Sequence, residues 1–260
     1  MDLYDLLQNH IGIFLLILTR VSAIFLIAPF FGSRNIPVVI RVSASVAITF
    51  VLFPIVLSQG VINLPDTLIG YAFVVFTELL VGWIIGFAAS LTFSAIHMAG
   101  QLLDMQVGFG VVNVLDPTTG QQVPIIGSFK YNLAIIIFLV TNGHHLLLTG
   151  LFESFKLIPI FGAVFNPSLT EIMVNLIWGI FTVAIKISIP VLVAIILTDV
   201  ALGVLARTMP QMNIFVVGIP AKIMVGLFVL SFALPFYILF LDVAFNEMYG
   251  NISIVLRAMQ

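Results

Sequence analysis

Long apolar runs dominate the sequence and set the class of fold that it can adopt. The first extends from about Ile11 to Phe31 with Arg20 near its middle, and the second begins after Pro37 and ends near Ser58. An α-helix needs about 20 apolar residues to cross a bilayer. The sequence therefore predicts an all-α fold of polytopic membrane-protein helical hairpins. The other runs cover residues 67–103, 125–140, 168–206 and 214–245, with a shorter run at 146–158.

The composition supports this class of protein. The chain is 62% hydrophobic and 8% charged, whereas soluble domains are about 45–50% apolar and about 25% charged. We expect membrane lipid around the chain and no nucleic-acid partner, because the net charge of −2 includes no basic run. Cysteine is absent, which excludes disulfides and thiolate metal sites. The acidic start at Asp2 and Asp5 indicates a retained first helix and not a signal peptide.

Two of the runs, 67–103 and 168–206, are longer than one bilayer crossing requires. We expect them to tilt, break or project beyond the membrane, with Pro190 kinking the second. A short amphipathic tail is expected to close the chain at Gln260. Loop charges give a weak bias that places both termini outside the cytoplasm. The residues counted on one side are Arg34, Arg41, Lys130 and Arg207, against Lys156 and Arg257 on the other.

An irregular yet apolar stretch separates the third and fourth runs, at about 105–122. Gly108 and Gly110 permit positive φ, and Pro117 disfavours helical backbone at Asp116. In a membrane protein, irregular backbone is tolerated only where it is buried in protein or lines a cavity. The stretch is therefore either an extramembrane loop or an apolar obstruction in a passage.

A row of small residues marks the third run, where Gly82, Gly86, Ser90 and Ser94 recur every four positions. Small residues at this spacing allow helix backbones to approach closely in a membrane. Two interpretations are open, namely packing within the chain and a seam between subunits.

Five charged residues lie in or at the ends of apolar runs. Such charges usually face a bundle interior or an aqueous cavity, and they would serve either an ion relay or structural pairing with polar groups of the same or another chain. We favour pairing, because a proton-coupled carrier would gather carboxylates and histidines on broken helices. The charges are Arg20, Glu78, Lys186, Asp199 and Arg207.

Signatures of enzymes and metal sites are missing from the sequence. There is no His-Glu-x-x-His helix and no Gly-x-Ser-x-Gly elbow. His144 and His145 are adjacent, so on a helix their side chains diverge, and a turn or interfacial role is favoured over metal binding. We expect no catalysis, no cofactor and no metal.

Two stretches carry a resemblance to a known family. One runs from Gly108 to Pro117, and the other, Leu205 to Pro220, contains Met-Pro-Gln-Met-Asn-Ile-Phe-Val-Val-Gly. Together with Arg34-Asn35-Ile36-Pro37 they make the chain similar, over its whole length, to the FliR/SctT family of type III secretion export-gate proteins. The run at Met209–Pro220 favours the flagellar branch over the injectisome branch.

The resemblance implies a non-enzymatic subunit of a gate built with FliP-like and FliQ-like subunits and joined by an FlhB-like subunit. The gate would lie in the bacterial inner membrane at the flagellar basal body, project toward the periplasm, contact rod-base proteins and pass unfolded export substrates. Residues 1–167 would be FliP-like and 168–260 a FliQ-like hairpin with a tail, in one integral structural unit.

The same resemblance makes the stretch at about 105–122 a plug of the closed pore. An apolar plug excludes water and therefore ions, and its glycines would let it swing aside. The alternative from another class is a single-chain carrier of small solutes, which predicts paired repeats and a midplane polar cluster, and neither is visible in the sequence. The plug residues are Met105, Gly108, Phe109, Gly110, Val111, Asp116 and Pro117.

Overall fold

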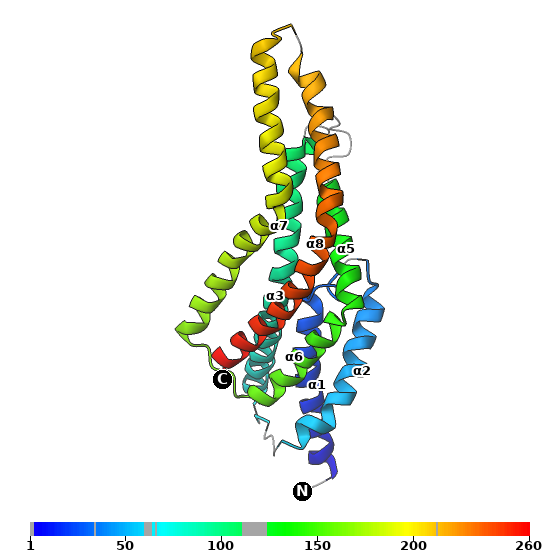
Figure 1. Ribbon diagram of the computed structural model, residues 1–260. Coiled ribbons are helices and arrows are strands. Elements are labelled where there is room, and N and C mark those ends of the chain that lie inside the picture. Colours follow the sequence, from blue (N-terminus) through cyan, green and yellow to red (C-terminus); the bar gives the residue numbers. More distant parts are fainter. Residues whose placement is uncertain (1–2, 34, 60–63, 66, 111–123, 212) are drawn as a thin grey trace. The chain divides into compact units, whose positions relative to one another are not determined.

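The computed structural model describes residues 3–33, 35–59, 64–65, 67–110, 124–211 and 213–260 (Figure 1). Every regular element among these residues is an α-helix, so the all-α prediction is confirmed. The helices are α1 Leu3–Ile27, α2 Val38–Leu57, α3 Leu68–Val107, α5 Ile125–Val140, α6 Gly143–Leu157, α7 Pro167–Thr208 and α8 Ile214–Ala258.

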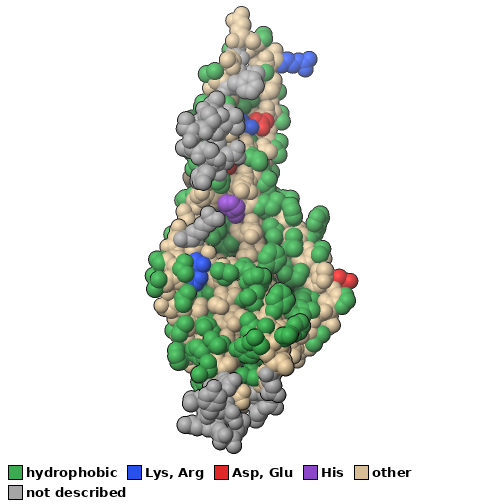
Figure 2. Space-filling model, turned by 180° about the vertical axis from the view of Figure 1, so that it is seen from behind, with side chains coloured by type: hydrophobic (Ala, Val, Ile, Leu, Met, Phe, Trp, Pro, Cys, Tyr) green, Lys and Arg blue, Asp and Glu red, His purple; other side chains and the backbone are tan. Residues whose placement is uncertain are grey.

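Five of these helices are long and apolar enough to cross a membrane, or six if α5 and α6 together form one span. Helices α3, α7 and α8 contain 40, 42 and 45 residues. At about 1.5 Å per residue they are about 60 Å long or more, roughly twice the hydrocarbon thickness of a bilayer. Hydrophobic side chains predominate over the face seen in Figure 2, and charged side chains there are few and isolated.

The tail of the chain differs from the sequence prediction. Residues 246–258 do not form a separate short helix but continue α8. The helix is held to its end because Ile252, Val255 and Leu256 are fully buried. No proline interrupts α8 after Pro235.

The described residues form two compact units, and each draws on both halves of the sequence. Unit 1 contains Met1–Leu91, Asn142–Leu176 and Asn246–Gln260, and unit 2 contains Thr92–Thr141 and Ile177–Phe245. Three long helices, α3, α7 and α8, pass from one unit into the other.

In unit 1, α1 packs against α2 through Phe14, whose ring lies 4.9 Å from that of Phe50 and 5.8 Å from that of Phe53. Helix α6 approaches the end of α8, where a side chain at Gly150 would lie 3.1 Å from Ile252. The backbone N–H of Val164 donates to Met259 O at 2.9 Å, which fixes the C-terminal end of the chain.

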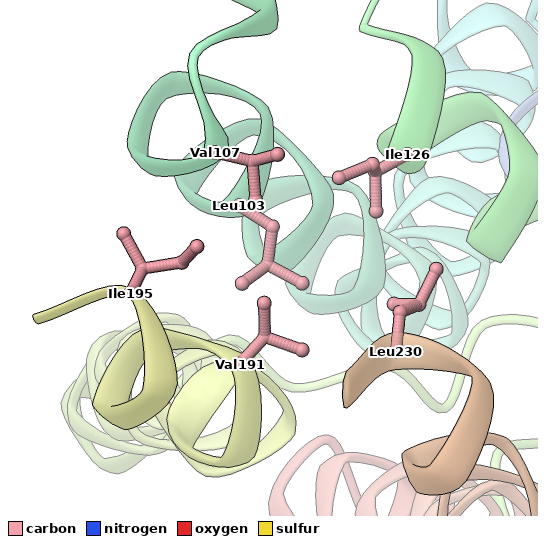
Figure 3. Close-up of a cluster of buried hydrophobic side chains, with 6 residues drawn as sticks. All are labelled: Leu103, Val107, Ile126, Val191, Ile195 and Leu230. Carbon is pink, nitrogen blue, oxygen red and sulfur yellow. The ribbon is translucent and has the colours of Figure 1, made fainter. Parts of the chain in front are cut away.

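In unit 2, α7 and α8 run as an antiparallel pair (Figure 1). Helices α3 and α5 join them around one apolar cluster, shown in Figure 3. The core of unit 2 therefore lies where the last turns of α3 meet the first turn of α5. The cluster consists of Leu103, Val107, Ile126, Val191, Ile195 and Leu230.

Candidate functional site

Helix α3 ends at a glycine that begins the predicted plug. Gly108 adopts a φ of 107°, and its N–H donates to Asp104 O at 3.3 Å. This backbone conformation favours glycine because a Cβ atom would be strained. The prediction of positive φ is therefore confirmed for Gly108, whereas Gly110 is not among the positive-φ glycines.

A buried carboxylate in the last turn of α3 binds the first turn of α5. The Asp104 side chain is 4% exposed. Its Oδ1 accepts a hydrogen bond from Ile126 N, and its Oδ2 accepts one from Gly127 N, both at 2.9 Å. Helix α5 begins after Pro124 and has no side-chain cap of its own, so Asp104 supplies the negative charge that a helix N-terminus favours. Asp104 therefore joins the two helices that precede and follow residues 111–123.

This clamp requires the backbones of α3 and α5 to touch. A Cβ atom added at Gly100 would overlap the Cα of Gly127. A Cβ added at Gly127 would lie 3.4 Å from Asp104 Oδ2 and 3.1 Å from Pro124. The two glycines therefore set the short distance that lets the carboxylate reach both amides.

We expect Gly100→Ala to destabilise the full chain, because α3 and α5 must move apart and the Asp104 bonds lengthen. Overpacking of this kind costs about 1–3 kcal/mol. Gly179→Ala in α7 is the matched control, since nothing lies within 4 Å of its added Cβ and alanine is favoured in a helix interior. Thermal unfolding in detergent checks this, and equal midpoints for the two variants would contradict the close approach.

The predicted plug residues are only partly within the described chain. Met105 is 66% exposed, and Phe109 is partly buried against the apolar cluster of unit 2. Gly110 has open space on its Cβ side, with Met105 Cα at 3.8 Å. Residues 105–110 thus form the fixed base of the predicted plug. The predicted plug residues Val111, Asp116 and Pro117 lie outside the described residues.

A second polar cluster is buried in unit 1. The side chains of Arg20 and Glu78 are 0% and 1% exposed. The Arg20 Nε donates to Glu78 Oε2 at 2.6 Å, and its Nη2 donates to Oε1 at 3.0 Å. This two-point geometry matches the planar guanidinium to the carboxylate, so these two embedded charges pair with each other.

The remaining donors of Arg20 bind the end of α6. Its Nη1 donates to Ser154 O at 3.0 Å and to Ile158 O at 2.9 Å. The Phe155 ring lies against the guanidinium, with 4.3 Å from Cζ to the ring centroid. Arg20 therefore joins α1, α3 and the C-terminal carbonyls of α6.

The other predicted embedded charges lie nearer the surface of the chain. Asp199 pairs with Lys222 at 2.9 Å, and their side chains are 46% and 21% exposed. Lys186 and Arg207 are exposed, and neither forms an ion pair within the part of the chain that the structure describes. The five charges are thus not brought together into one relay.

The small-residue row faces α1 at its start. A side chain at Gly82 would lie 2.6 Å from Ala23 Cβ, and one at Gly86 would lie 3.1 Å from Ile24 O. These two glycines therefore pack within the chain. Further along, the Ser90 hydroxyl donates to Phe87 O in its own helix, and Ser94 is exposed.

Sequence reasoning missed two buried charges. Asp104 was assigned no role, because the two amides that it binds lie 22 and 23 residues later in the chain. Lys130 was counted as a loop charge, but it lies inside α5 and is 3% exposed. Because Lys130 belongs to no loop, it no longer counts toward the loop-charge bias from which the orientation of the termini was predicted.

The helices and their long apolar spans define an all-α polytopic membrane protein. A match to the family described as "Bacterial export proteins, family 1" covers residues 11–248, and the chain belongs to this family. It is 39% identical over 223 residues to "Flagellar biosynthetic protein FliR" of Bacillus subtilis, covering 84% of each chain. The Aquifex aeolicus protein of the same name is 29% identical, covering 88% of each chain. The Escherichia coli protein of that name is 26% identical over 91% of this chain and 89% of its own.

Proposed function

We propose that the chain is a non-enzymatic subunit of the flagellar type III protein export gate in the bacterial inner membrane. It assembles with FliP-like and FliQ-like subunits, is joined by an FlhB-like subunit, passes unfolded export substrates and helps to nucleate rod assembly toward the periplasm. The observation that carries this proposal is the family match over residues 11–248. The flagellar names of the relatives favour this use over injectisome service.

Partner subunits would cover the exposed apolar surface of α7 and α8, because these helices are longer than the bilayer hydrocarbon is thick. Helices α7 and α8 expose large side chains such as Trp178 and Phe228. Both helices are about twice as long as the bilayer hydrocarbon is thick. Exposed apolar patches of this kind usually mark protein or membrane contacts. The assignment of residues 168–260 as the FliQ-like hairpin and of residues 1–167 as the FliP-like region follows from the family resemblance and is part of the same proposal.

The stretch at about 105–122 plugs the closed pore in this proposal. What supports it is the clamp at its base, since Asp104 holds the last turn of α3 and the first turn of α5 together. The clamp sets the distance between the two helices that flank the stretch. Phe109, at the base of this stretch, packs against the apolar cluster of unit 2.

Copurification tests the assignment to a gate. We expect the tagged full chain to be extracted from the membrane in one large complex when FliP-like and FliQ-like chains are produced with it. Omitting either partner should reduce its level, because the apolar hairpin then lacks its cover. A stable monomer that binds a small solute would contradict the gate and favour a carrier, and copurification with injectisome chains alone would contradict the flagellar assignment.

A further inference from the structure

A pocket of about 170 Å³ lies in unit 2 among α5, α7 and α8, away from the clamp at Asp104. Its lining combines two lysines with an otherwise apolar wall, and it contains no acidic residue. The principal lining residues are Lys130, Lys186, Pro190, Leu234, Tyr237 and Phe240.

The first lysine is buried without a counter-charge. Lys130 is 3% exposed, and its Nζ lies 3.5 Å from Ile187 O and 4.6 Å from the centroid of the Tyr237 ring. The Tyr237 hydroxyl is not an anion, so it does not neutralise the Lys130 ammonium. Its proton is donated to Lys130 O at 3.0 Å. An ammonium has three donors, and within the described residues Lys130 forms no ion pair. Burial of such a charge is costly unless an anion is supplied.

The second lysine adds charge at the same opening. Lys186 on α7 lines the pocket, is exposed and forms no ion pair among the residues that the structure describes. It lies four residues before Pro190, on the same face of the helix. Two ammonium groups, one buried and one exposed, therefore face one small space.

The rest of the pocket suits hydrocarbon. Leu230, Leu234 and Phe240 line its wall, and Phe236, at 73% exposed, places its opening on the surface of unit 2. Exposed Phe232 and Leu239 continue the apolar surface along α8, within a helix long and apolar enough to cross a membrane. A small inorganic anion would satisfy the lysines but leave this apolar surface uncovered.

We infer that this pocket binds the head group of an acidic phospholipid, with the phosphate between Lys130 and Lys186 and an acyl chain along α8. The lysines attract the anionic head group, and the apolar wall selects a lipid over free phosphate. The inference does not depend on the export gate proposed above, because it requires only the geometry of unit 2 and a membrane.

Native mass spectrometry of the full chain, extracted in its complex with mild detergent, tests the inference. The sample receives equal amounts of phosphatidylglycerol and phosphatidylcholine with identical acyl chains. We expect retention of one phosphatidylglycerol with a preference of about 25-fold, since each of the two lysines near the anionic lipid contributes about a factor of five. Lys186→Gln should lower this preference by about fivefold. Lys186 is exposed and forms no ion pair among the described residues, so this substitution should preserve the fold.

Lys222→Gln is the matched control, because Lys222 lies on α8 in the same unit but pairs with Asp199 outside the pocket. Lys222→Gln should keep the preference for phosphatidylglycerol over phosphatidylcholine, whereas Lys130→Met should abolish it. Equal retention of the two lipids, or an unchanged preference in Lys186→Gln, would overturn the inference. So would complete displacement of the lipid by millimolar inorganic phosphate, or a photo-crosslinker at position 186 that captures a protein side chain in place of lipid.

Discussion

Glu78→Gln is expected to lower the free energy of unfolding of the full chain by about 3–5 kcal/mol, because it leaves the buried Arg20 cation without its carboxylate. In the native chain the guanidinium makes two bonds to Glu78, at 2.6 and 3.0 Å, and has no exposure to solvent. Glutamine retains one acceptor but no charge. Denaturant unfolding in detergent, with the steady-state level of the chain as a second readout, measures the loss.

Asp199→Asn is the control for this prediction, since it also removes one acidic partner from an ion pair. The Asp199–Lys222 pair is partly exposed, and such pairs contribute about 0–1 kcal/mol. Replacing both Arg20 and Glu78 by methionine should recover part of the lost free energy of unfolding. The recovery should be incomplete, because Ser154 O and Ile158 O would lose their donor. Equal effects of Glu78→Gln and Asp199→Asn would show that the buried pair does not hold unit 1 together.

Asp104→Ala is expected to increase the ion leak of cells, measured per molecule of the chain in the membrane. The change leaves Ile126 N and Gly127 N without their acceptor, at about 1–3 kcal/mol for each unsatisfied group, and it releases the base of the proposed plug. Without these bonds, the two helices that flank the proposed plug can separate, and the plug would no longer be held in the closed pore. Membrane conductance, or decay of the proton gradient in cells producing the variant, measures the leak.

Gln101→Ala serves as the control, because Gln101 lies one turn earlier on α3 and is exposed, and its amide contacts the exposed His97 at 3.2 Å. Asp104→Asn should give an intermediate leak, since its amide retains a single acceptor oxygen. If Asp104→Ala accumulates normally and conducts no more than Gln101→Ala, the clamp has no part in closing a pore.

The elements of the fold were largely predictable because helix formation in this chain follows from apolar runs and breakers. Pro37, Pro124 and Pro167 all stand where a helix begins or just before it. The interruption predicted around Asn142 is present, with Asn142 at a φ of 58° directly before α6. The end of α8 was not predicted, since its continuation depends on tertiary burial of Ile252 and its neighbours and not on a local signal.

The site was less predictable because its bonds join residues that are distant in sequence. Nothing local indicates that Asp104 caps a helix 22 residues later, or that Arg20 reaches the end of α6. Lys130 was counted with the loop charges although the predicted run at 125–140 already contains it, and only the tertiary structure shows that it is buried. The glycine contact between Gly100 and Gly127 likewise requires knowledge of which helices cross.

The bonds of Arg20 also bear on the timing of biosynthesis. Its carboxylate partner is 58 residues later in the chain, and the carbonyl of Ile158 is 138 residues later. At about 5–20 residues per second, the ribosome reaches Glu78 several seconds after it has added Arg20. It reaches Ile158 roughly 7–28 s after Arg20. The nascent first helix therefore carries a lone cation through the insertion machinery, and unit 1 is completed only after most of the polypeptide has been translated.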